Sequence, residues 1–169
     1  MTDGLRVAVT GTPGTGKTTA TTLLDAEVIH LNDLIREAGL WSERDDDRDS
    51  LVADLDAVQE AIGDWSGVAE SHLAHHLDAD RVVVLRCRPD VLADRLRERG
   101  ADEAKATENA ESEALDVILS EAVDRHGLDH VYEIDTTDRP PADVATDIEA
   151  VVSGDRAPSA GDVDFTDYL

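Results

Sequence analysis

The chain has 169 residues, of which 39 are acidic and 15 basic, so its formal net charge is −24. A surface this acidic argues against nonspecific binding to nucleic acids and to anionic membranes. Disorder is also excluded, because 41% of the residues are hydrophobic and they fall in periodic segments.

The first predicted strand leads directly into a glycine-rich loop. Residues 5–10 form a short segment rich in β-branched residues, residues 11–18 fit G-x-x-x-x-G-K-[ST], and residues 17–24 are typical of a helix. A strand, a glycine loop and a helix N-terminus together form a site for polyphosphate. The alternative, a glycine-rich turn that arose by chance, is disfavoured because the whole pattern lies between a strand and a helix. We therefore predict that the protein binds a nucleoside triphosphate.

The residue types in this loop fit phosphate chemistry. Glycines allow successive backbone N–H groups to turn toward phosphate oxygens, and Lys17 supplies a positive charge near the β- and γ-phosphates. The hydroxyl of Thr18 is suited to Mg²⁺, the metal we expect with ATP. The residues predicted to bind ATP here are Gly14, Thr15, Gly16, Lys17, Thr18 and Thr19.

Further strands and helices alternate along the rest of the chain. The remaining predicted strands cover residues 27–30, 67–70, 81–85 and 131–135. The remaining predicted helices cover residues 32–38, 50–62, 89–99, 103–126 and 141–152. Alternation of this kind predicts an α/β fold with a five-stranded parallel sheet covered by helices on both faces. We expect the polar first third of the helix at 103–126 to project from the body.

Some segments have no core pattern. Residues 43–49 and 100–109 are polar, and we expect both to be mobile insertions. Residues 153–169 form an acidic C-terminal tail that ends with Phe165 and Tyr168. Two interpretations of the tail are open: a loosely ordered acidic segment, or an aromatic anchor that docks on the body or on a partner.

The charge is unevenly distributed. Residues 1–40, which contain the glycine loop, have five acidic and three basic residues, so the region that would hold a tetra-anionic nucleotide is nearly neutral. Elsewhere the acidic surface is typical of adaptation to high salt, although it would also suit a basic protein partner. A single cysteine, Cys87, excludes an internal disulfide. We see no signal peptide and no apolar run near the ~18 residues of a membrane span, and we expect a cytoplasmic location.

Several later segments resemble one enzyme family. Residues 29–36, Ile-His-Leu-Asn-Asp-Leu-Ile-Arg, resemble the segment that opens the nucleoside-monophosphate-binding region of adenylate kinases. Residues 70–72, Glu-Ser-His, follow the acidic-x-His pattern of one subfamily. The Arg-Leu-Arg-Glu-Arg-Gly run at 95–100, then Lys-Ala-Thr-Glu-Asn at 105–109 and Glu113, resemble its arginine helix, short lid and post-lid helix. That subfamily is the adenylate kinase isoenzyme 6 family, the Fap7-like nucleotide kinases, which include archaeal adenylate kinases.

The resemblance covers roughly residues 4–152 and implies a domain organisation. It implies a P-loop nucleoside monophosphate kinase-like domain over residues 1–152. Within that domain it places a monophosphate-binding insertion at about 30–53 and a short lid at about 98–109.

The resemblance also implies an activity and residue roles. The reaction is transfer of the γ-phosphoryl group from MgATP to AMP, giving two ADP, with ATP hydrolysis as a further activity. Arg36 would contact the AMP phosphate, Arg99 would reach the donor phosphates or stack near adenine, and Arg139 matches a basic position near the adenine. The alternative that the family suggests is an ATPase switch in maturation of the small ribosomal subunit, acting mainly through a ribosomal protein partner.

The candidate catalytic residues are Lys17, His72, Arg95 and Arg99. Glu70 follows a central strand, where it would hold a Mg²⁺-bound water with Thr18, although it could also be one more surface acid. His72 would orient a phosphate or an attacking water, or would merely begin a helix.

Two further arguments concern the basic side chains. In so acidic a chain, Arg95 and Arg99 are better explained as phosphate clamps than as surface residues, whereas Arg97 is expected to face solvent. The spacing of His72, His75 and His76 fits either a zinc site or a solvated helix face, and the second interpretation is favoured because no further ligand lies nearby in sequence.

The chain departs from ordinary adenylate kinases in two ways. It lacks their Asp-Gly-Phe-Pro-Arg run after the third strand, and it lacks the arginine pair that larger lids contribute. We therefore expect less complete closure of the site and more competition from water.

Overall fold

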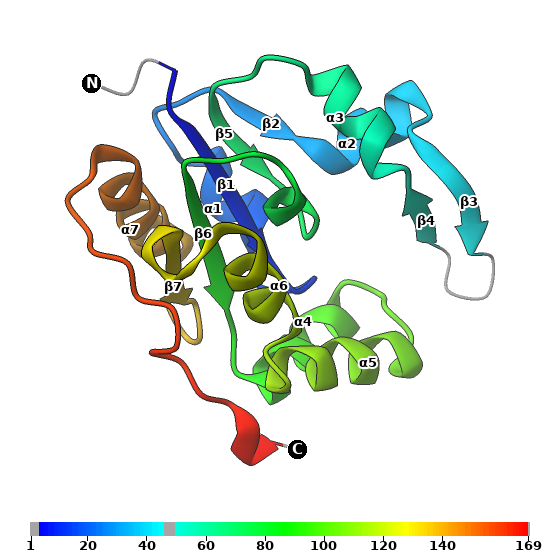
Figure 1. Ribbon diagram of the computed structural model, residues 1–169. Coiled ribbons are helices and arrows are strands. Elements are labelled where there is room, and N and C mark those ends of the chain that lie inside the picture. The colour runs from blue at the N-terminus through cyan, green and yellow to red at the C-terminus, as the bar shows by residue number, and fades with distance from the viewer. Residues whose placement is uncertain (1–3, 46–49, 169) are drawn as a thin grey trace.

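A computed structural model describes residues 4–45 and 50–168, with side chains between 42 and 51 left out of the description. Its centre is a five-stranded sheet in the order β2-β5-β1-β6-β7 (Figure 1). Every neighbouring pair in this sheet is parallel. The strands are β1 (Arg6–Gly11), β2 (Val28–His30), β5 (Gly67–Glu70), β6 (Arg81–Arg86) and β7 (Val131–Asp135). The five strands predicted from the sequence are thus confirmed.

Helices cover both faces of the sheet. The α-helices are α1 (Lys17–Thr22), α2 (Leu31–Ala38), α3 (Leu55–Ile62), α4 (Pro89–Glu98), α5 (Glu103–Ala114), α6 (Val117–His126) and α7 (Pro141–Ser153). Short 3₁₀ helices are η1 (Ala74–His76), η2 (Leu128–His130) and η3 (Thr166–Tyr168). No helix in the described ranges has the length and apolar character needed to cross a bilayer.

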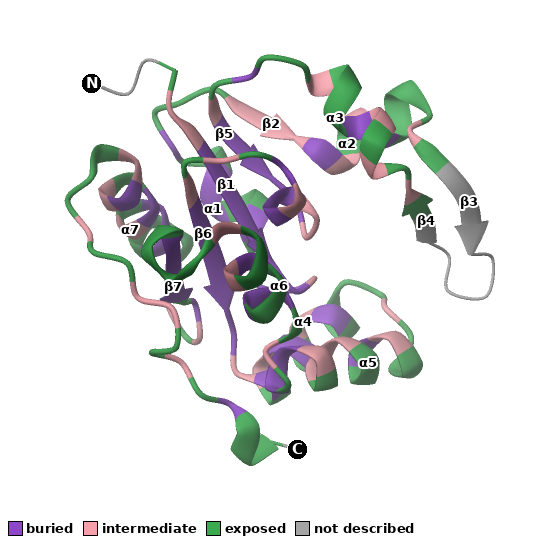
Figure 2. Ribbon diagram, in the orientation of Figure 1, coloured by how far each residue is buried: buried purple, intermediate pink, exposed green. Residues whose placement is uncertain are grey.

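The alternation of side chains along β1 divides the core between the two faces. Val7 and Val9 pack with Ala20 of α1 and Ile148 of α7, while Ala8 points to the face covered by α2, α3 and α6. Successive residues of a strand point to opposite faces, so a strand buried on both sides is apolar throughout. Figure 2 shows this pattern as buried central strands beneath helices whose outer faces are exposed.

The prediction of a single helix at 103–126 is wrong, because the chain turns between α5 and α6 and forms two helices. Asp116 adopts a left-handed backbone with φ of 56°, and its carboxylate accepts a hydrogen bond from Arg86 at 2.5 Å. A buried arginine thus holds this residue outside the helix. The polar first third does not project either: Ala106 is fully buried with Leu92 and Leu96 of α4. Most of the expected mobile insertion at 100–109 is therefore the start of a packed helix.

The helix predicted at 50–62 begins later than expected. Residues 50–53 form β4 (Ser50–Ala53), which pairs antiparallel with β3 (Trp41–Asp45). The helix starts at Leu55, because the Asp54 side chain accepts a hydrogen bond from the Ala57 amide and caps it. Of the expected mobile insertion at 43–49, residues 43–45 belong to β3 and residues 46–49 lie outside the described residues.

The C-terminal tail docks on the body. The Phe165 side chain is buried, and the Arg86 guanidinium lies 5.4 Å from the centre of its ring. The Ser159 amide donates to the carbonyl of Val131, and the Gly161 amide donates to the carboxylate of Glu133. The structure therefore favours the aromatic anchor over the loosely ordered segment.

Candidate active site

The glycine loop joins the carboxyl end of β1 to the start of α1. Gly11 and Gly14 have φ of 152° and 98°, and a side chain at either position would crowd its neighbours. A Cβ on Gly11 would lie 2.7 Å from the Leu85 carbonyl oxygen, and one on Gly14 would lie 3.1 Å from Leu96. The loop therefore needs glycine both for its backbone conformation and for its close approach to β6 and α4.

Lys17 is folded back over this loop. Its side chain is buried, and Nζ donates to the carbonyl oxygens of Gly11 at 2.9 Å and Thr12 at 3.1 Å. Burial lowers the pKa of Lys17 to about 8, although Glu70 opposes this shift. The ammonium group is thus charged at neutral pH and incompletely compensated, which favours an incoming polyphosphate.

ATP binding is expected to take up a proton above pH 8, because phosphates around Nζ will raise the pKa of Lys17 again. Free Lys17 is largely neutral above about pH 8, so protonation on binding makes ATP affinity fall by up to about tenfold per pH unit. Calorimetry of ATP binding at pH 8–9 in buffers of different ionisation enthalpy measures this uptake. The Lys17→Met variant should lose it, and the absence of proton uptake by the native protein would contradict the argument.

Glu70 lies beside the loop at the end of β5. It is 3% exposed, so the surface-acid interpretation is wrong. Its Oε1 accepts hydrogen bonds from Thr18 Oγ1 at 3.1 Å and His30 Nδ1 at 2.8 Å. Parallel registry explains the convergence, because Glu70 is the partner of Val9 on β1 and of His30 on β2.

This cluster fits Mg²⁺. Carboxylate and hydroxyl oxygens are the ligand types that this ion accepts, directly or through its waters. Among the described side chains, no arginine or lysine forms an ion pair with Glu70, so its buried charge has no permanent cationic partner. The sequence reasoning missed His30; the available signal was its position at the end of a predicted strand, next to Glu70 in the sheet.

His72 and Arg95 flank the loop in different ways. Burial, followed by the charge of Lys17, lowers the pKa of His72 to about 4, so its imidazole is neutral near pH 7. A neutral imidazole can orient a phosphate or a water but contributes no charge. Arg95 donates to the Gly14 carbonyl at 3.4 Å and to the Thr136 carbonyl at 3.1 Å. Its described contacts therefore tie the loop to the segment after β7.

All of the predicted ATP, AMP, magnesium and catalytic residues line one cavity. Its volume is about 1790 Å³, whereas a pocket for one small ligand typically measures about 300–1,000 Å³. The cavity therefore has room for two nucleotides. Arg36 of α2, Arg99 at the end of α4, and Arg139 after β7 contribute to its wall.

The arginines of this wall differ in their partners. Arg139 pairs with Asp147 at 2.8 Å, and Arg97, which lies outside the wall, pairs with Asp94 and Glu103 as its predicted solvent exposure suggests. In contrast, Arg36 and Arg99 are exposed and form no ion pair with any carboxylate among the described side chains. Both guanidinium groups are thus available to anions.

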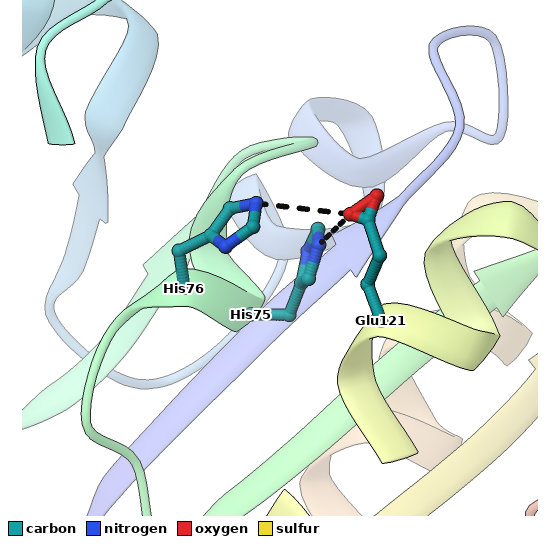
Figure 3. A group of neighbouring side chains, drawn as sticks. All are labelled: His75, His76 and Glu121. Carbon is teal, nitrogen blue, oxygen red and sulfur yellow. Dashed lines mark hydrogen bonds and ion pairs between the residues drawn. The ribbon is translucent and has the colours of Figure 1, made fainter. Parts of the chain in front are cut away.

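The three neighbouring histidines do not share a solvated helix face, so that interpretation is wrong. His75 is 1% exposed and hydrogen-bonds through Nδ1 to Thr10 Oγ1 at 2.7 Å. His75 and His76 approach Glu121 of α6, while His72 is not part of this group (Figure 3). The sequence could not indicate Glu121, because it lies far along the chain.

Comparisons with known proteins agree with this geometry. Residues 7–116 match the AAA domain family. A protein named "Putative adenylate kinase" from Natronomonas pharaonis is 65% identical over 168 residues, which cover 98% of this chain and 100% of the relative. A protein of the same name from Halobacterium salinarum is 60% identical, with 98% and 100% coverage. Shikimate kinase from Acinetobacter baumannii in complex with shikimate has a TM-score of 0.59 at 15% identity, over 90% of this chain and 94% of that one, a likeness of fold alone.

Proposed function

Because the chain belongs to the P-loop family whose members are named "Putative adenylate kinase", we propose that it transfers the γ-phosphoryl group of ATP to AMP. Its fold is that of a P-loop nucleotide kinase. The choice of AMP as acceptor is the proposed step beyond that assignment.

The proposal rests on Arg36 and Arg99, two exposed arginines that form no ion pair with any carboxylate among the described side chains. The chain has 39 acidic residues against 15 basic ones. In such a chain most arginines can find a carboxylate, so an arginine without an ion pair is unusual. Arg36 and Arg99 line the same cavity as the phosphate-binding loop, but they come from different elements, α2 and the end of α4. Two guanidinium groups contributed by different elements suit a donor phosphate and an acceptor phosphate.

The proposed mechanism is positioning and charge neutralisation. Backbone amides of the loop and Lys17 would hold the donor phosphates, Arg99 would join them, and Arg36 would hold the phosphate of AMP. Thr18 and Glu70 would hold Mg²⁺, which neutralises charge on the phosphates when bound. The acceptor phosphate is already anionic, so no side chain has to remove a proton from it.

An assay of the purified protein in molar KCl tests this proposal. Protein with MgATP is incubated with and without AMP, and ADP and inorganic phosphate are followed separately. Formation of ADP that depends on AMP, without release of phosphate, is the expected result. Phosphate release that is indifferent to AMP would contradict the proposal.

Arg36→Ala is expected to raise KM for AMP by about 10- to 100-fold, since a charge-assisted contact contributes about 1.5–3 kcal/mol. ATP affinity and any slow ATP hydrolysis should remain unchanged, because Arg36 is assigned to the acceptor alone. Steady-state kinetics with AMP varied at saturating ATP provide the measurement. Arg97→Ala is the matched control, as its side chain pairs with Asp94 and Glu103. Equal loss of hydrolysis in Arg36→Ala would refute its assigned role.

A second candidate, an ATPase switch, is favoured by His72. Its imidazole is neutral and lines the cavity, and the charge of Lys17 contributes to lowering its pKa. It could therefore hold an attacking water near the donor phosphates. For this candidate, the net charge of −24 suits a basic partner such as a small-subunit ribosomal protein. The assay above separates the two candidates, because only the kinase needs AMP.

A further inference from the structure

Two histidines and one glutamate converge on the wall of the cavity (Figure 3). His75 and His76 come from η1, and Glu121 comes from α6. Glu121 Oε2 lies 3.3 Å from His75 Nε2 and 3.8 Å from His76 Nε2. One ligand atom from each residue falls within 4.8 Å of the others.

These separations suit coordination better than direct pairing. A charge-assisted N–H···O bond is normally about 2.7–2.9 Å long, shorter than both contacts to Glu121 Oε2. With metal–ligand bonds of about 2.0–2.1 Å, two ligands of a tetrahedral zinc ion lie about 3.3 Å apart. A single carboxylate oxygen facing two imidazole nitrogens at 3.3 and 3.8 Å therefore leaves a space of the size that such an ion needs.

The surroundings of His75 orient it for this role. Its Nδ1 lies 2.7 Å from Thr10 Oγ1, and its Nε2 hydrogen-bonds to Glu121 Oε2 at 3.3 Å. When an ion takes the lone pair of Nε2, the ring proton lies on Nδ1, which can then donate to Thr10 Oγ1. Metal-binding histidines commonly have their second nitrogen fixed in this way. The backbone of η1 is also held to α6, since His126 Nε2 donates to the His75 carbonyl at 2.7 Å.

The charge of Glu121 is not already neutralised by a permanent cation. Within the described side chains, its ion pairs are with His75 and His76 alone, and no lysine or arginine pairs with it. It is 43% exposed and His76 is 30% exposed, so an ion can enter from solvent. A carboxylate beside two imidazoles is a donor set for transition metals, whereas Mg²⁺ prefers oxygen ligands only.

We propose that His75, His76 and Glu121 bind one divalent transition-metal ion of the zinc class. The site is separate from the Thr18 and Glu70 cluster suited to Mg²⁺. Three protein ligands leave one position for water or for another ligand, as in zinc sites that remain open. Because the three residues line the nucleotide cavity, the bound ion would join η1 to α6 at its wall.

Titration of the full chain with Zn²⁺ tests this site. The protein is first treated with a chelator and dialysed, and is then titrated calorimetrically. Molar KCl screens the acidic surface, and excess Mg²⁺ saturates the sites for hard cations. One Zn²⁺ per chain is expected. Co²⁺ in its place should give the intense visible absorption of a four-coordinate ion, a readout independent of catalysis.

Variants of the exposed ligands identify the site. His76→Ala and Glu121→Gln are each expected to lower Zn²⁺ affinity at least about 100-fold, more than the ~10–100-fold lost with a residue that only supports a ligand. His130→Ala and Glu111→Gln are matched controls that should bind like the native protein. Circular dichroism checks that each variant is folded. Equal Zn²⁺ binding by all four variants, or no binding by the native protein in excess Mg²⁺, would overturn the proposal.

Discussion

Lys17→Met is expected to lower kcat/KM for phosphoryl transfer by about 10²–10³-fold or more while leaving the protein folded. Lys17 is the basic residue built into the phosphate loop, with Nζ against the carbonyl oxygens of Gly11 and Thr12. A preorganised positive charge of this kind, acting on a phosphoryl group in transfer, typically contributes about 10²–10³-fold or more. Methionine keeps most of the length and apolar contacts of the side chain but has no charge to offer.

The stability of the Lys17→Met variant shows whether its loss of activity comes from the missing charge or from unfolding. Burial lowers the pKa of Lys17 from 10.5 to about 8, so the folded state disfavours the charged form by roughly 3 kcal/mol at neutral pH. Between pH 8 and 10.5 Lys17 is protonated in the unfolded chain but largely neutral in the folded one. The free energy of unfolding therefore rises with pH in this range, as the cost of the buried charge disappears. Removing the charge relieves the cost and offsets the two lost hydrogen bonds.

We therefore expect the free energy of unfolding of Lys17→Met to equal or exceed that of the native protein. Urea unfolding at pH 7 provides that measurement, and coupled-enzyme kinetics provide the activity. Lys17→Arg is measured beside it as a second variant, in case Lys17→Met does not fold. It retains a charge but should also lose most activity, because the larger guanidinium cannot occupy the buried position of Nζ. Substantial transfer by a folded Lys17→Met would refute the role of the loop lysine.

Local patterns account for what the sequence predicted well. The strands of the central sheet are short segments rich in apolar and β-branched residues, and the phosphate loop is a motif whose residues are all close in sequence. The β3–β4 hairpin was missed because its pairing is confined to two short strands whose neighbouring residues are highly charged. Asp54, a residue type that commonly precedes a helix, lies within the predicted helix at 50–62. Taking it as the N-cap would have placed the start of the helix at Leu55, as observed.

The contacts missed in the site are those between distant parts of the chain. Thr12 donates to Glu113 at 3.0 Å, which joins the phosphate loop to the end of α5, and His30 donates to Glu70 at 2.8 Å. No motif spacing indicates either pair. The break between α5 and α6 also depends on a contact between distant residues, because Asp116 lies outside the helix where it accepts a hydrogen bond from Arg86.

Arg86→Ala is expected to lower the free energy of unfolding by about 3–5 kcal/mol, because it removes the only described cation among three carboxylates. Arg86 is 1% exposed. Its guanidinium lies 2.7 Å from Glu133, 2.5 Å from Asp116 and 3.3 Å from Glu113, the last contact being too poorly aligned for a hydrogen bond from Nε. Burial also raises the pKa of Glu113, which shows how costly its charge is even with the arginine present.

Arg97→Ala is the matched control for this experiment. Arg97 forms ion pairs of similar length, 2.8 Å to Asp94 and 2.7 Å to Glu103, but it is 44% exposed. Exposed pairs contribute about 0–1 kcal/mol and are screened by salt, whereas buried pairs are screened much less. Urea unfolding at low salt and in molar KCl should therefore show a loss in Arg86→Ala that persists, and a loss in Arg97→Ala that disappears.

The same substitution should release the C-terminal tail before the sheet unfolds. Phe165 packs against the Arg86 guanidinium, and Glu133 accepts hydrogen bonds from the amides of Gly161 and Val163. Without the arginine, Glu133 becomes a buried carboxylate that gains by turning toward water, which breaks its contacts to the tail. Hydrogen exchange should therefore accelerate at Gly161 and Val163 in Arg86→Ala and remain unchanged in Arg97→Ala. If Arg86→Ala costs less than about 1 kcal/mol, or if exchange in the tail is unaffected, the buried arginine does not hold the tail to the body.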